Sequence, residues 1–218
     1  MKLKACWIRK ILKNYENIDF LWFNFIDYSK RKIDMFQAKK ISEDIDEENS
    51  LSPESSLPDR EKGAIKRVCI KKVWLFDKKF SYEEIVKIMQ FAKLDSVQLY
   101  SNNLENFKKL KNKWYFVIKP IQINKIEEFE KYKNFVDLFI IDGKNPWSWK
   151  TYDYKKINNL NLEKNFLLAG WVSEENILEI KKIFKNNKFF CWVDVASSID
   201  NWENIDLEKV KKIVNLIK

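Results

Sequence analysis

Short apolar runs alternate with amphipathic stretches from one end of the chain to the other. The apolar runs are the expected β-strands, at residues 3–6, 18–25, 68–76, 96–100, 115–120, 136–142, 166–170 and 190–196. Helical periodicity marks 81–94, where Ser81 and Glu84 form a capping-box signature, then 173–186, and a last segment with Asp206 as N-cap. Eight strand–helix units of roughly 27 residues each predict a compact α/β fold, a single-domain (β/α)₈ barrel over 1–218. An open doubly wound sheet is the alternative, because periodicity alone does not exclude it.

One segment interrupts this alternation. Residues 42–66 are rich in serine, proline and acidic residues and contain few large apolar side chains. Such a composition cannot bury enough apolar surface to become part of a core. We therefore expect an exposed or disordered insertion between the second helix and the third strand, and no domain boundary, because the alternation resumes afterwards.

Composition restricts the classes of function. The net charge is +9, but only four of the cationic residues are arginine and the lysines are spread over all predicted helices, which favours a solvated basic surface over nucleic-acid binding. No apolar stretch approaches the roughly 18 residues of a membrane span, and the charged N-terminus is unlike a secretion signal. Cys6, Cys69 and Cys191 are widely separated, which argues against disulfides or a zinc site and for a reducing cytoplasm.

Polar residues stand where several predicted strands end. In a (β/α)₈ barrel the active site forms at the C-terminal ends of the strands, and the residues there include Cys6, Gln98, Asp142 and Asp194. The chain has no histidine, so acid–base chemistry must use other groups, and a thiol and a carboxylate can serve as base and acid. The alternative is structural: a cysteine often packs as a small hydrophobe, and an aspartate after a strand often caps a turn.

Ordered segments along almost the whole chain outside 42–66, from KACWI to WVDVASSID, resemble motifs of the phosphoribosylanthranilate isomerase family of tryptophan biosynthesis. KACWI resembles the family's opening K-x-C-G-I, DSVQLYS its D-x-V-Q-L-H-G, and WVDVASSID its G-V-D-V-S-S-G-V-E. Further similar segments, in family order, are IDFLWFNFIDYSKRKI, VWLFDKKFSYEEI, DLFIIDGKNPWSWKTYDY and FLLAGWVSEENI. Each motif is modest by itself, but the ordered set is specific.

The resemblance implies an Amadori rearrangement of N-(5′-phosphoribosyl)anthranilate, with Cys6 as general base, Asp142 as general acid and Arg31 holding the anthranilate carboxylate. It also implies loops that bind the substrate or its phosphate, at Gly170, Trp171, Asp194, Ala196, Ser197 and Ser198, and an active-site loop with Trp147, Ser148 and Trp149. The implied partner is this small phosphorylated substrate, without metal, organic cofactor, nucleic acid or membrane, for a cytoplasmic monomer or homodimer. An isomerase of the related histidine pathway is a weaker alternative. Those barrels typically use two catalytic aspartates, whereas this chain has Cys6 at the first of the two positions.

Tryptophan occupies the family's glycine positions. The chain has three glycines where average usage of about 7% would give roughly 15, and it has nine tryptophans. The tryptophans aligned with family glycines are Trp7, Trp22, Trp74, Trp147, Trp149, Trp171, Trp192, Trp202 and, before the fifth strand, Trp114. Three interpretations compete: ordinary core aromatics, a vestigial phosphate–sugar-binding barrel without isomerase activity, or a UGA codon that the host reads as glycine and that is translated here as tryptophan. We favour the third, because it accounts for the deficit, the excess and the positions together.

Overall fold

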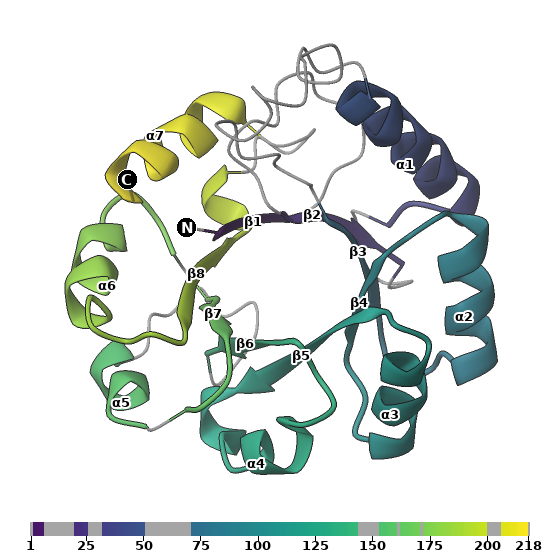
Figure 1. The fold of residues 1–218 in the computed structure, drawn as a ribbon. Helices are drawn as coiled ribbons and strands as arrows, with labels where there is room; N and C mark the ends of the chain where they lie inside the picture. Colours follow the sequence, from purple (N-terminus) through teal and green to yellow (C-terminus); the bar gives the residue numbers. More distant parts are fainter. Residues whose placement is uncertain are drawn as a thin grey trace, which may run out of the picture.

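The structure, a computed structural model, is a closed barrel of parallel strands surrounded by helices (Figure 1). It describes residues 2–6, 20–25, 32–50, 71–143, 153–160, 162–170, 172–199 and 206–217. The strands are β1 Lys2–Cys6, β2 Phe20–Asn24, β3 Lys71–Phe76, β4 Ser96–Leu99, β5 Phe116–Gln122, β6 Leu138–Asp142, β7 Phe166–Leu168 and β8 Phe190–Val195, paired in sequence order with β8 beside β1. The helices are α1 Met35–Ser50, α2 Tyr82–Phe91, α3 Leu104–Asn112, α4 Glu128–Tyr132, α5 Tyr154–Asn158, α6 Ile177–Ile183 and α7 Leu207–Ile217. The predicted barrel is confirmed, and the open sheet is excluded.

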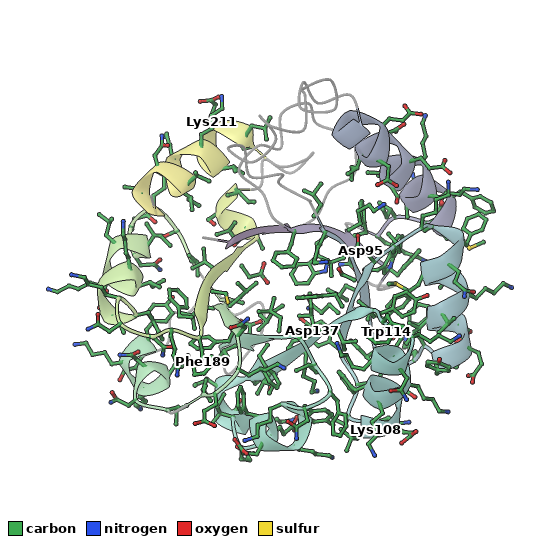
Figure 2. All side chains as sticks on the ribbon, in the orientation of Figure 1. Asp95, Lys108, Trp114, Asp137, Phe189 and Lys211 are labelled. Carbon is green, nitrogen blue, oxygen red and sulfur yellow. The ribbon has the colours of Figure 1, made fainter. Side chains whose placement is uncertain are left out.

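Two apolar cores follow from the alternation of side chains along the strands. The larger core lies between the strands and the helices, and Val97 and Leu99 of β4 belong to it. The smaller core includes Trp22, Ile118 and Ile140. Side chains fill the interior of the barrel as well as the space between strands and helices (Figure 2). Because successive residues of a strand point to opposite faces, each strand contributes to both cores. The strands therefore read as almost continuous apolar runs, which is why they were detectable in the sequence.

The strand pairings close with a regular stagger. The strand pairings connect Trp22 of β2, through β3, with Ser96 of β4. The next inward residue of β4, two positions after Ser96, is Gln98. Repeating this operation, two strand pairings and then two residues forward along the strand, leads from Gln98 to Ile140. Two further repeats lead from Ile140 to Asp194 and from Asp194 back to Trp22. Four moves of two residues give a stagger of eight, the shear typical of this barrel. We define a level of the barrel as a set of four such inward positions, one from each of four alternate strands. One level therefore consists of Trp22, Gln98, Ile140 and Asp194.

Local capping signals start the helices where the sequence predicted them. Ser81 accepts a hydrogen bond from the Glu84 amide, and the Glu84 carboxylate accepts one from the Ser81 amide, which completes the predicted capping box of α2. Asp206 accepts hydrogen bonds from the amides of Glu208 and Lys209, 3.0 and 3.2 Å away, and so caps α7 as expected. The helix predicted over 173–186 is shorter in the structure: α6 begins at Ile177 and ends at Ile183.

Two aspartates connect neighbouring strands through side-chain hydrogen bonds at the N-terminal end of the barrel. Asp137, just before β6, accepts a hydrogen bond from the Val117 amide of β5 at 2.8 Å, and the Lys111 ammonium lies 2.7 Å from its carboxylate. Asp95, just before β4, accepts a bond from the Lys72 amide of β3 in the same way. These hydrogen bonds fix the register of neighbouring strands, which agrees with the structural role of the N-terminal face in such barrels.

The predicted insertion over 42–66 begins later than expected. Residues 42–50 belong to helix α1, in which Ser42 and Ile45 are buried. The reason is the spacing of Ala38, Ile41 and Ile45, which places three apolar side chains on one face despite the acidic residues around them. The remaining part, 51–66, lies outside the described residues, so its exposure stays a prediction. Within the described part of the chain, no helix is long and apolar enough to cross a membrane.

Candidate active site

Cys6 and Asp142 lie in two consecutive levels of the barrel, toward the C-terminal ends of the strands. The pairing of Cys6 with Trp22 places Cys6 in the level that also contains Leu75 and Pro120, immediately above the level of Trp22. Asp142 lies two residues beyond Ile140 of β6 and so belongs to the next level up. The barrel geometry therefore brings these two sequence-predicted residues to the same mouth from strands far apart in the chain.

The Asp142 carboxylate is half-buried at the end of β6. Its Oδ1 atom accepts a hydrogen bond from the Gly143 amide at 2.7 Å. This local bond holds the side chain beside the strand end. Asn24 occupies the same level on β2 and is buried, with its carbonyl oxygen accepting from the Ile33 amide at 3.0 Å. Asn24 was not among the predicted site residues, because an asparagine at a strand end usually signals only a turn.

Other predicted site residues lie at the ends of β7 and β8. Gly170 has φ 83°, a left-handed conformation that favours glycine, and its carbonyl accepts a bond from the Tyr154 hydroxyl at 3.4 Å. Ala196 follows β8 and leads into a 3₁₀ turn over Ser197–Ile199. The Oγ atom of Ser198 is buried without a hydrogen-bond partner among the described residues.

Asp194 is partly buried within β8, pairs with Lys4 of β1, and lies two levels below Asp142. Arg31, Trp147, Ser148, Trp149 and Trp171 lie outside the described residues, so their roles stay predictions. Among the residues that are described, no group of three or more histidine, cysteine, aspartate or glutamate side chains is arranged to hold a metal ion.

A buried lysine that was not among the predicted site residues supports the loop between β4 and α3. Lys119 on β5 is 3% exposed, and its ammonium donates to the Ser101 carbonyl at 2.8 Å. The Tyr132 hydroxyl donates to the next carbonyl, that of Asn102, also at 2.8 Å. The Lys119 ammonium lies 4.6 Å from the centre of the Tyr132 ring and 3.9 Å from the Glu128 carboxylate. A lysine within the apolar run FVIKPIQ is the signal that was available, since a strand lysine in a barrel must be buried or snorkel.

We expect the stability contribution of Lys119 to depend on pH. Burial lowers the pKa of Lys119 from 10.5 to about 8; Glu128 opposes this shift, and Lys131 and Lys125 add to it. Because the folded-state pKa is below the unfolded one, the unfolded chain binds more protons between about pH 8 and 10.5, and stability rises with pH in that window. Relative to Lys119→Met, the unfolding free energy of the parent should rise by about 3 kcal/mol across the window in urea titrations. A difference that stays constant with pH would contradict this assignment.

Two of the described tryptophans, Trp114 and Trp74, sit in unfavourable settings. Trp114 is 93% exposed and has φ 64° directly after α3, where its amide donates to Lys111 at 2.9 Å and the Tyr115 amide reaches back to Leu110 at 3.4 Å. This is the Schellman arrangement, whose left-handed position is usually glycine. The indole N–H of Trp74 is buried without a hydrogen-bond partner among the described residues, and Trp22 fills the barrel interior one level below Cys6.

Comparison with known proteins gives one consistent result. The profile of the N-(5′-phosphoribosyl)anthranilate (PRA) isomerase family matches residues 30–216. The N-(5′-phosphoribosyl)anthranilate isomerase of Clostridium acetobutylicum is 27% identical over 231 residues, which cover 100% of this chain and 98% of that protein. The crystal structure of the phosphoribosyl anthranilate isomerase of Thermotoga maritima superposes with a TM-score of 0.75 at 22% identity, covering 99% of this chain and 98% of that one. A structure of such an isomerase with reduced 1-(o-carboxyphenylamino)-1-deoxyribulose 5-phosphate has a TM-score of 0.71 at 20% identity, covering 99% and 97%.

Proposed function

The chain belongs to the N-(5′-phosphoribosyl)anthranilate isomerase family, and on that premise we propose that it isomerises this substrate with Asp142 as general acid and Cys6 as general base. The observation that carries the proposal is the position of the two residues in consecutive levels at the C-terminal mouth, where barrels of this type perform catalysis. An arrangement of one carboxylic acid and one thiolate suits a reaction that needs one proton donated and another removed.

The reaction is an internal redox rearrangement. Asp142 donates a proton to the furanose ring oxygen while the bond from C1′ to that oxygen breaks, which leaves an open-chain imine. The Cys6 thiolate then removes the proton from C2′, and the enolamine formed tautomerises to 1-(o-carboxyphenylamino)-1-deoxyribulose 5-phosphate. C2′ is oxidised to a ketone as C1′ is reduced to an amine carbon, so no external oxidant or reductant is consumed.

Each group must be available in the correct protonation state. Asp142 must be protonated for part of the time in order to act as the acid. Cys6 must be a thiolate for part of the time, against a free thiol pKa of about 8.5. These requirements belong to the proposal and call for a titration of the active enzyme.

The substrate contacts proposed around this pair come from separate loops. Arg31 would bind the anthranilate carboxylate, because a guanidinium holds a carboxylate through two hydrogen bonds. The loops after β7 and β8 would bind the phosphate through backbone amides, as phosphate sites in such barrels do. The left-handed Gly170 supports this, since it lets the backbone turn without a side chain at the mouth. A cytoplasmic monomer or homodimer completes the proposal.

Turnover of freshly prepared N-(5′-phosphoribosyl)anthranilate tests the proposed function. The protein made by its own host should consume the substrate and complement a bacterial strain that requires tryptophan because it lacks this isomerase. The same host-made protein failing both assays, while folded, would favour the second candidate, a binding barrel without isomerase activity. That candidate would still show an increase in melting temperature with a sugar phosphate.

We also propose that the natural protein has glycine at the nine tryptophan positions. Support comes from the left-handed Trp114 and from the buried indole N–H of Trp74, which has no hydrogen-bond partner in the described part of the chain. A buried donor without a partner costs roughly 1–3 kcal/mol, and a left-handed non-glycine residue roughly 1–2 kcal/mol. The mass of the protein purified from its host decides the matter, and UGG codons at Trp7, Trp147, Trp149 and Trp171 would exclude it.

Trp114→Gly should raise the unfolding free energy by about 1 kcal/mol, because glycine adopts the left-handed conformation after α3 without steric cost. Urea denaturation measures this change. Lys93→Gly is the matched control: Lys93 has φ 51° after α2 in the same hydrogen-bond arrangement, so it reports what this conformation alone is worth. An unchanged or lower stability in Trp114→Gly would show that the position does not call for glycine.

A further inference from the structure

A buried carboxamide lies in the barrel interior one level below Cys6 and two levels below Asp142. Gln98 of β4 is 2% exposed, and its Oε1 atom has no hydrogen-bond partner among the described residues. Its neighbours along the strand, Val97 and Leu99, both belong to the outer core, so alternation directs Gln98 into the barrel interior. A buried amide oxygen without a donor is rare in native proteins and calls for an explanation.

The surroundings of Gln98 restrict where a donor can come from. The paired positions on the adjacent strands are Leu75 and Ile118, whose side chains carry no polar atom. Below Gln98 in the interior lie Val73 and Ile118 of the apolar inner core. Above it comes the level of Cys6, on the side of the C-terminal ends of the strands. Trp22 shares the level of Gln98, so a donor for Oε1 comes either from an inward side chain such as Trp22 or from the side of the mouth.

From this placement we propose that the Gln98 carboxamide binds a hydroxyl group of the sugar chain of the substrate at the floor of the active site. The inference rests on the proposed function and adds a specificity-determining residue to it. A sugar hydroxyl supplies the missing donor, and the amide N–H groups of the same side chain can donate to a neighbouring sugar oxygen. A site built to hydrogen-bond a substrate hydroxyl discriminates strongly against analogues that lack it.

The substitution Gln98→Met separates a binding role from a structural one. Methionine has nearly the same shape without the buried polar atoms, so the melting temperature should rise by about 2–4 °C. In the same variant, kcat/KM for the isomerase reaction should fall by about 10- to 100-fold. Gln90→Met, the same change on the exposed face of α2, is the control and should alter neither quantity. A structural glutamine would behave in the opposite way: lower stability with kcat/KM unchanged.

Ribulose 5-phosphate provides a readout that does not depend on isomerase turnover. At saturation it should raise the melting temperature of the parent by about 3 °C and that of Gln98→Met by less than about half as much. Equal shifts in the two proteins would overturn the inference, even if the parent is an active isomerase. A parent without turnover that still shows the larger shift would leave Gln98 as a sugar-binding residue and refute only the proposed reaction. A Gln98→Met variant with unchanged kcat/KM and higher stability would assign the missing donor to a water molecule and also overturn it.

Discussion

Asp142→Asn lowers kcat of the isomerase by about 10²- to 10⁴-fold without unfolding the protein. Asparagine cannot donate a proton of suitable acidity to the ring oxygen, and general acid catalysis typically contributes a factor of this size. Its amide oxygen can still accept the bond from the Gly143 amide, which spans 2.7 Å in the structure, so the local backbone should be preserved. Steady-state kinetics with circular dichroism as a folding check measures the effect.

A matched control for this substitution is Asp77→Asn. Asp77 also follows a strand at the C-terminal end of the barrel, and it accepts a bond from the Lys79 amide at 2.9 Å, but it has no place in the proposed chemistry. Its kcat should change by less than about threefold, as for a surface substitution away from the site. Comparable losses in both variants would mean that Asp142 acts through the fold of the loop rather than as the acid.

Cys6→Ser should abolish turnover to a similar extent, because a serine hydroxyl is a far weaker base than a thiolate. The double variant with Asp142→Asn should be scarcely less active than either single one, since residues that act in one mechanism are not additive. Additive losses would indicate that the two side chains act independently, and that the proposed pairing across the barrel mouth is incorrect.

Glycine at all nine tryptophan positions raises kcat/KM by at least about 100-fold over the chain as written. Near the active site the largest contribution should come from Trp147, Trp149 and Trp171, which align with family glycines in the loops around the substrate. A loop that closes over a substrate needs backbone conformations that glycine adopts readily, and a phosphate-binding amide needs an unobstructed approach. Parallel assays of the two proteins measure the gain.

Alanine at the same nine positions is the control for side-chain size. Alanine removes the indole bulk but still disfavours positive φ, so its activity should fall between the two proteins if both effects matter. Glycine variants that fold and yet remain no more active than the chain as written would refute both the glycine assignment and its link to the isomerase reaction.

The strands and several helix starts were readable in the sequence because the signals are local. All eight predicted strands overlap observed ones, and Ser81 with Glu84 and Asp206 cap the expected helices. The errors arose where tertiary packing overrides composition. Residues 42–50 read as an acidic loop, but Ile41 and Ile45 dock the segment on the barrel as the end of α1. The start of α6 at Ile177 was likewise missed, because a serine followed by an asparagine fits a turn as well as a cap.

The order of motifs by itself determined the family, the barrel and the candidate pair Cys6 and Asp142, because these depend on residue identity and on where each strand ends. Only the tertiary structure decided which residues share a level of the barrel, since that follows from hydrogen bonds between strands distant in sequence. It revealed that Gln98 is buried in the barrel interior, with an oxygen that no described residue pairs, and that Lys119 supports the loop after β4. Burial and the supply of hydrogen-bond partners are properties of the closed barrel, so no single strand can specify them.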